Sequence, residues 1–303
     1  MPLPNCLIIG AAKAGTTALY RYLREHPQVF MSPVKEPSFF AHEGARLDEC
    51  FRGPGDWIVA QNTVTRWEDY LQLFAAAPDT ATAIGEASVI YLQSPEAPAR
   101  IRRYVPQARL IAVLRQPADR AYSHYLMLRR DGRESVRDFR EALRREDERV
   151  RLGWGTGWHY RRRGFYAESV ERYQALFSRE QLRFYLYEDW QADNLGVLPD
   201  IFRFLEIDDN FMPTTTRRYN VGGLPRSRVW HTLLHQPHPL KDLVRPMFPK
   251  PLADRLWLGL RDMNLVRDSL DPALRAELTE EYRADILRLQ DLLQRDLSHW
   301  LKT

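Results

Sequence analysis

Several features are scarce in this chain of 303 residues, and each scarcity removes a class of protein. Only two cysteines are present, Cys6 and Cys50, which is too few for a disulfide framework and favours a reducing compartment. No segment approaches the roughly 18–20 consecutive apolar residues that cross a membrane. The apolar stretch 6–12 has no basic region before it and runs into Lys13, unlike a signal peptide. We therefore expect a cytoplasmic protein without a transmembrane segment, whose fold begins at its first residues.

Net charge is also low, at +4, and acids are mixed evenly with bases, so the composition does not indicate a nucleic-acid-binding protein. With 44% hydrophobic and 28% charged residues, the chain resembles ordinary globular domains and not disordered, collagen-like or coiled-coil proteins. Lysine is rare among the bases, since 39 of the 44 are arginines. Two of the five lysines, Lys13 and Lys35, nevertheless fall within the first 35 residues, which favours a specific role.

Short apolar runs closed by glycine, proline or charged residues are typical of buried strands, and stretches with helical spacing lie between them. We expect strands at 3–9, 29–31, 81–88, 109–115 and 182–187. We expect helices at 15–25, 67–77, 118–129, 166–177, 195–205 and 272–297. This alternation predicts an α/β fold, a single domain over 1–303 with a central parallel sheet flanked by helices on both faces.

Other segments show no such period. We expect irregular structure at 41–65 and 214–227, a surface helix and a mobile excursion at 131–163, and a helical C-terminal segment at 265–303. The excursion carries four aromatic residues, which predict an acceptor-side lid or, alternatively, packing into the core: Trp154, Trp158, Tyr160 and Phe165. Arginines at 129–163 form either a cradle for an anionic acceptor or a solvated helix of ion pairs. The oligomeric state is not readable from these patterns.

A glycine-rich turn, Gly10-Ala-Ala-Lys13-Ala-Gly15-Thr16-Thr17, joins the first strand to the first helix. Such a turn aims backbone N–H groups and a helix N-terminus at one point, where they bind an anion. The glycines keep the spacing of a kinase P-loop, but Thr16 occupies the lysine position and the lysine has moved to position 13. This P-loop-like turn suits a 5′-phosphate that carries one reactive group.

The stretch 7–19, with IIGAAKAGTTAL, resembles the 5′-phosphosulfate loop of the sulfotransferase family, whose donor is 3′-phosphoadenosine-5′-phosphosulfate (PAPS). The stretch 109–130 resembles the 3′-phosphate motif of that family, with Arg115 at the strand end and Ser123 two helical turns later. An arginine fork and a serine hydroxyl are suited to a phosphate group. The resemblance implies that the loop residues Lys13, Ala14, Gly15, Thr16 and Thr17 bind the donor together with Arg115 and Ser123.

A later stretch, 219–228, resembles the loop that folds over the nucleotide in bacterial-type members of the family. The resemblance implies that Gly222 and Gly223 let this loop close and that Arg226 reaches the 3′-phosphate. The motif Arg163-Gly-Phe-Tyr166, followed by a helix, also matches the middle segment of the family.

The candidate base is Glu36, in a K-E-x-x-F-F stretch that resembles heparan-sulfate-type and related bacterial sulfotransferases, where this glutamate is the proposed base. A carboxylate after a short strand and before two phenylalanines is also suited to partial shielding from water. A surface pair with Lys35 is the alternative interpretation, and His42 is the competing base.

The chain departs from the heparan-type pattern at one point: it has Glu86-Ala87 where those members have Glu-Lys. We therefore give Ala87 no role and expect Lys13 to be the main catalytic cation. Glu86 either lines the acceptor pocket or is a buried structural carboxylate. No H-x-x-x-H or C-x-x-C spacing suggests a metal site, and sulfuryl transfer with a nucleotide leaving group requires no divalent metal.

The sequence thus predicts a PAPS-dependent sulfotransferase that acts on a hydroxyl of a small-molecule, lipid or saccharide acceptor. One alternative is a P-loop nucleotide kinase or ATPase. It fits less well because GK[ST] is missing and strand 109–114 leads to Arg115 instead of a magnesium-binding aspartate. The other is a non-catalytic nucleotide-binding relative, which the position of Glu36 relative to the loop would distinguish.

Overall fold

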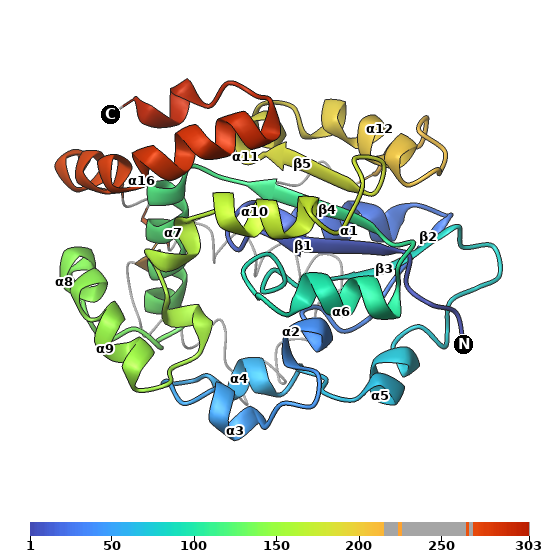
Figure 1. Ribbon diagram of the computed structural model, residues 1–303, viewed down its shortest axis with the longest axis horizontal. Coiled ribbons are helices and arrows are strands. Elements are labelled where there is room, and N and C mark those ends of the chain that lie inside the picture. The colour runs from blue at the N-terminus through green and yellow to red at the C-terminus, as the bar shows by residue number, and fades with distance from the viewer. Residues whose placement is uncertain (215–223, 226–264, 267–268, 303) are drawn as a thin grey trace, which may run out of the picture.

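Figure 1 shows the computed structural model of the chain, which describes residues 1–214, 224–225, 265–266 and 269–302. The expected donor-binding residues Gly222, Gly223 and Arg226 lie outside the described residues.

Five strands form the main sheet: β1 (Cys6–Gly10), β2 (Val29–Met31), β3 (Ala83–Ala87), β4 (Arg109–Leu114) and β5 (Leu182–Leu186). Their order is β2-β3-β1-β4-β5, and all four pairings are parallel. Two short strands, β6 (Leu224–Pro225) and β7 (Leu265–Val266), pair antiparallel.

Helices connect the strands and cover both faces of the sheet. The longer ones are α1 (Thr16–Glu25), α6 (Ala97–Tyr104), α7 (Pro117–Arg130), α10 (Ala167–Gln174), α12 (Asn194–Phe204) and α16 (Pro272–Leu293). Shorter ones are α2 (Phe39–His42), α3 (Leu47–Cys50), α4 (Trp57–Ala60), α5 (Trp67–Gln72), α8 (Phe139–Arg144), α9 (Glu146–Arg151) and α11 (Tyr187–Ala192), with 3₁₀ turns η1 (Thr156–Trp158), η2 (Arg162–Gly164) and η4 (Ser298–Leu301).

The direction of the crossovers decides which helix covers which face. From β1 the chain moves toward β2, whereas from β3 it moves the opposite way, to β4 and then β5. Right-handed crossovers in opposite directions place their helices on opposite faces. In Figure 1, α6 and α10 accordingly lie in front of the sheet and α1 lies behind it. The predicted parallel sheet with helices on both faces is confirmed.

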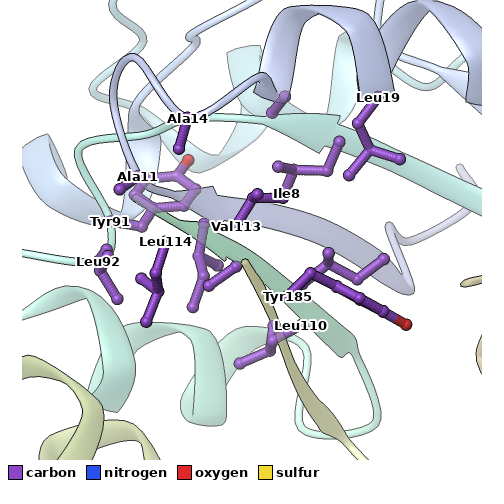
Figure 2. Packing of buried hydrophobic residues seen from close by; sticks show 14 of the residues in the cluster. Ile8, Ala11, Ala14, Leu19, Tyr91, Leu92, Leu110, Val113, Leu114 and Tyr185 are labelled. Atoms are coloured by element: carbon purple, nitrogen blue, oxygen red, sulfur yellow. The ribbon is translucent and has the colours of Figure 1, made fainter. Parts of the chain in front are cut away.

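The middle of the sheet lies in the core, because β1 and β3 are buried along their whole length. Figure 2 shows Tyr91 and Leu92, from the turn after β3, near Ala11 and Leu114. A Cβ added to Gly10 would lie 2.7 Å from the Cβ of Leu92, closer than real Cβ contacts allow. Glycine at this position therefore lets the turn after β3 pack directly against the start of the loop after β1.

The segment 131–163 is folded and packed. Trp158 and Tyr160 are buried, so for these two the interpretation as core residues is confirmed. The carboxylate of Asp56 accepts hydrogen bonds from the indole Nε1 of Trp158, at 3.0 Å, and from the backbone N–H of Gly155, at 2.8 Å. These bonds tie the segment 41–65 to 131–163. A role for 131–163 as an acceptor-side lid stays a prediction.

Most arginines of this segment have acidic partners. Arg144 and Arg145 both pair with Glu141 on the exposed face of α8, as the solvated-helix interpretation expects. Arg149 makes a different, buried pair, donating from Nη1 and Nη2 to the two carboxylate oxygens of Glu134 at 2.7 and 3.0 Å. The arginines are therefore largely used within the fold.

Candidate active site

Three residues expected to carry the chemistry, and Val89, which was not predicted, follow the carboxyl ends of neighbouring strands. Lys13 lies in the loop after β1, Glu36 follows β2, Val89 follows β3 and Arg115 follows β4. The chain leaves β1 toward β2 and leaves β3 toward β4, in opposite directions along the sheet. Ligands of open α/β sheets bind at such a switch point, outside the carboxyl ends of the strands. The topology thus brings four distant parts of the sequence to one edge.

The loop between β1 and α1 is shaped to receive an anion. Gly15 caps α1 in the left-handed conformation, with φ of 88°, and a Cβ there would lie 3.2 Å from Cδ1 of Trp190. Among the described residues, the backbone N–H groups of Gly15, Thr16 and Thr17 have no hydrogen-bond acceptor. Free N–H groups at a helix N-terminus, with the helix dipole behind them, form a binding site for a phosphate-like group.

Lys13 is half-buried in this loop and is held close to other cations. Burial, and after it the positive charges of Arg130 and Arg115, lower the pKa of its ammonium group to about 8. An unfavourable concentration of positive charge of this kind is relieved when an anion binds. The electrostatics of Lys13 thus agree with the anion site that the loop geometry provides.

Arg115 joins the loop to β4. Its Nη1 donates a hydrogen bond to the carbonyl oxygen of Lys13 at 3.1 Å, and its guanidinium carbon lies 4.6 Å from the centre of the Tyr187 ring. In the described part of the chain it forms no ion pair with an acid, so it is not a structural ion-pair arginine there. Ser123 is half-buried on α7, two helical turns beyond Arg115, and no described residue hydrogen-bonds to its side chain.

Glu36 is held in a defined position on the opposite side of β1. Its φ is 63°, and its backbone N–H donates to the carbonyl of Ala87 at 2.9 Å. One carboxylate oxygen, Oε2, accepts a hydrogen bond from the N–H of Val89 at 2.8 Å, and the other pairs with the ammonium group of Lys35. The expected Lys35 pair therefore forms, but it is half-buried and belongs to a larger network.

Charge interactions place Glu36 and the anion loop at the same end of the sheet. Lys35, bonded to Glu36, is one of the cations that lower the pKa of Lys13. The negative charge of Glu36 raises the pKa of Arg163. The positive charges of Arg163 and Lys13 both lower the pKa of His124. The role of Glu36 as the base stays a prediction.

Two other candidates occupy different positions. Glu86 is fully buried and accepts hydrogen bonds from the hydroxyl groups of Tyr70, at 3.2 Å, and Ser88, at 2.8 Å. Burial raises the pKa of Glu86 to about 7, and the residue is a buried structural carboxylate. His42 packs its ring 5.1 Å from that of Phe51, and burial lowers its pKa.

Three neighbours of the anion loop were not predicted from the sequence: Tyr187, Trp190 and Arg130. Tyr187 and Trp190 lie on α11, which was not predicted, and both lie within 3.4 Å of a Cβ built on Gly15. Arg130, at the end of α7, is the cation that lowers the pKa of Lys13 most strongly. Arg130 closes the stretch already identified as the 3′-phosphate motif, so the motif itself was the available signal.

The sequence pattern of the family described as "Sulfotransferase family" matches residues 4–211, more than half of the chain. The chain belongs to the sulfotransferase family. The prediction of a member of the sulfotransferase family with a P-loop-like α/β fold is thereby confirmed, and PAPS as the donor stays a prediction.

Relatives of known structure or description agree with this placement. The crystal structure of a sulfotransferase from Alicyclobacillus acidocaldarius is 33% identical, covers 100% of both chains and superposes with a TM-score of 0.78. The human heparan sulfate glucosamine 3-O-sulfotransferase 6 is 28% identical over 86% of this chain and 70% of its own length. The mouse bifunctional heparan sulfate N-deacetylase/N-sulfotransferase 4 is 28% identical over 77% of this chain. This sulfotransferase-family chain matches only 25% of the length of that bifunctional relative.

Two further observations concern what the described residues contain. None of their helices is both long and apolar enough to cross a membrane. Within the same residues, no three side chains of His, Cys, Asp or Glu gather as a metal site would need. The cytoplasmic location stays a prediction.

Proposed function

We propose that this chain transfers a sulfuryl group from PAPS to a hydroxyl group of a small-molecule, lipid or saccharide acceptor. The observation that carries the proposal is the pairing of two elements at one end of the sheet. One is the loop of free N–H groups with Lys13, joined to Arg115. The other is the carboxylate of Glu36, fixed by Val89 on the opposite side of β1.

In the proposed reaction, Glu36 takes the proton of the acceptor hydroxyl as its oxygen attacks sulfur. A new O–S bond forms while the S–O bond to the 5′-phosphate breaks, and adenosine 3′,5′-bisphosphate leaves. Lys13 and the N–H groups of Gly15, Thr16 and Thr17 neutralise the charge that develops on the leaving phosphate. The proton, the sulfuryl group and the leaving group are thus all accounted for without a metal ion.

The opposite end of the donor is assigned to Arg115 and Ser123. Arg115 has no acidic partner among the described residues, and the side chain of Ser123 has no hydrogen-bond partner among them, so both are available to a 3′-phosphate. We propose the same role for Arg226, with Gly222 and Gly223 allowing its loop to close, on the family resemblance alone. Ala14 completes the loop through its backbone.

The proposal also specifies the chemical group that accepts the sulfuryl group. The relatives named above include one described by O-sulfation and one by N-sulfation, so a hydroxyl or an amine is the acceptor class common to both. We assign a hydroxyl because a carboxylate base positioned by hydrogen bonds suits deprotonation of an alcohol. Ala87, at the position of a lysine in heparan-type members, is buried and cannot supply a charge.

The experiment is a transfer assay with radiolabelled PAPS and a panel of alcohols, glycosides and amino sugars, in the presence of a chelator. Wild-type protein should label hydroxyl acceptors, and Glu36→Gln should lower turnover roughly 10²-fold while keeping nucleotide binding. Lys13→Ala should lower both binding and transfer.

Glu43→Gln is the matched control, because Glu43 is also a half-buried carboxylate but pairs with Arg100 on α6. It should retain wild-type turnover. Full activity of Glu36→Gln would remove the proposed base, and labelling of amines alone would correct the acceptor class.

A further inference from the structure

Arg163 is a buried cation whose position the fold itself does not explain. In the described part of the chain its guanidinium has no carboxylate partner and makes only two side-chain hydrogen bonds. Nη2 donates to the carbonyl oxygen of Val89 at 3.3 Å, and Nε donates to Oε1 of Gln93 at 3.0 Å. Burying a charge without an ion-pair partner costs stability, so a functional reason is expected.

Val89 forms hydrogen bonds with both Arg163 and Glu36. The N–H of Val89 donates to Oε2 of Glu36 at 2.8 Å, while the carbonyl of Val89 accepts from Arg163. Val89 is therefore fixed from both sides. The positive charge of Arg163 and the negative charge of Glu36 also attract each other across it, and this attraction opposes the burial that lowers the pKa of Arg163 to about 10.

Arg163 is itself held rigidly. Gln93 returns a hydrogen bond from Nε2 to the backbone carbonyl of Arg163 at 2.8 Å, so the two residues bind each other reciprocally. Three residues later, the hydroxyl of Tyr166 donates to the carbonyl of Arg115 at 3.0 Å, and the N–H of Tyr166 donates to Asp285 of α16 at 2.7 Å. The segment 163–166 thus connects the Glu36 side of the site with the Arg115 side.

We propose that Arg163 is a positioning residue for sulfuryl transfer, which sets the orientation of the Glu36 carboxylate through Val89 without touching donor or acceptor. The proposal rests on the function of Glu36 as the base. Misplacement of a reacting group by about 1 Å costs roughly 10²-fold in rate. Loss of Arg163 should therefore act on turnover and leave the affinity for nucleotide unchanged.

The experiment is a double-mutant cycle in the transfer assay, with Arg163→Gln, Glu36→Gln and the double variant. Arg163→Gln should lower kcat by about 10²-fold, with the KM for PAPS and the Kd for adenosine 3′,5′-bisphosphate within about twofold of wild type. In the Glu36→Gln background, Arg163→Gln should lower kcat by less than about threefold. Arg163 acts through the Glu36 carboxylate, which this background no longer contains.

Two further variants keep the test decisive. Arg163→Lys, which keeps a charge and can still donate to Val89, should recover part of the lost turnover even if Arg163→Gln folds poorly. Arg162→Gln is the neighbouring control, since Arg162 is exposed and pairs with Asp147 outside the site; it should behave as wild type.

Equal losses from Arg163→Gln in both backgrounds, or a loss of nucleotide binding that matches the loss of turnover, would overturn the positioning role and leave Glu36 as the base. Full activity of Glu36→Gln alone would overturn the base, and the role of Arg163 with it. The two failures are therefore distinguishable.

Discussion

At the scale of single residues, the site depends on cations that the fold keeps close together before any ligand is present. Burial of Lys13, together with the positive charges of Arg130 and Arg115, lowers the pKa of its ammonium group to about 8. A neutral lysine has no charge to attract a phosphosulfate, so the protonation of Lys13 should control donor affinity. In the unfolded chain its pKa returns to about 10.5, so folding penalises the charged form.

This linkage predicts how nucleotide binding depends on pH. Adenosine 3′,5′-bisphosphate favours protonated Lys13, which dominates below pH 8 and disappears above it. The Kd of the bisphosphate should therefore rise by about tenfold between pH 7 and pH 9, and binding near pH 8 should take up a proton. Calorimetry in two buffers of different ionisation enthalpy measures both quantities. Lys13→Ala should show weak binding and a flat profile over the same range, and a flat profile in the wild type would contradict the assignment.

At the scale of elements, local sequence signals predicted those parts of the fold that carry them. The β4–α7 crossing was predicted because β4 is continuously apolar and Pro117 is suited to the first turn of α7. Helix α6 was missed because it has only eight residues and buries three of them, Ala97, Pro98 and Ile101. Helix α11 was missed because it begins at the residue after β5, with no turn residue between them.

The same distinction applies to the candidate site. The loop around Lys13 was predicted from sequence because its glycines, lysine and threonines are adjacent. The bond from Val89 to Glu36 joins residues 53 positions apart, and that from Arg163 to Val89 joins residues 74 apart. Contacts of this kind depend on strand order and loop path, which no local pattern contains. Arg163 was therefore visible as part of a motif, but its position beside Val89 was not.

The segments around the sheet also carry a testable prediction about stability. Arg149 and Glu134 form a bidentate salt bridge that is almost fully buried. The hydroxyl of Tyr160 donates a hydrogen bond to the same glutamate at 2.8 Å. Removing one charge of a buried pair leaves the other without compensation. Glu134→Gln should lower the free energy of unfolding by about 3–5 kcal/mol, measured by urea titration.

The matched control for that measurement is Glu141→Gln, which breaks the exposed pairs with Arg144 and Arg145. It should cost less than about 1 kcal/mol. Equal small losses in both variants would show that the buried pair does not stabilise the packing of 131–163 against the rest of the fold.

At the scale of the whole molecule, the site is assembled from four strand ends and is braced by the C-terminal helix. The carboxylate of Asp285 on α16 accepts a hydrogen bond from the backbone N–H of Tyr166. The side-chain amide of Gln116, just before α7, donates to the hydroxyl of Thr279 on α16 at 3.0 Å. Residues of α16 thus support both Tyr166, whose hydroxyl donates to the carbonyl of Arg115, and Gln116, which follows Arg115. The family match covers 4–211, while α16 contributes these supports from beyond it.

We infer that this assembly recognises a 3′-phosphorylated adenine nucleotide and not a nucleoside triphosphate. Calorimetric titration of the full chain with adenosine 3′,5′-bisphosphate, ADP and ATP, each with and without magnesium, tests it most directly. We expect the bisphosphate to bind at least about tenfold more tightly than ADP without magnesium, and Arg115→Ala to remove most of that difference. Tighter binding of ATP with magnesium, with no preference for the 3′-phosphate, would contradict the account.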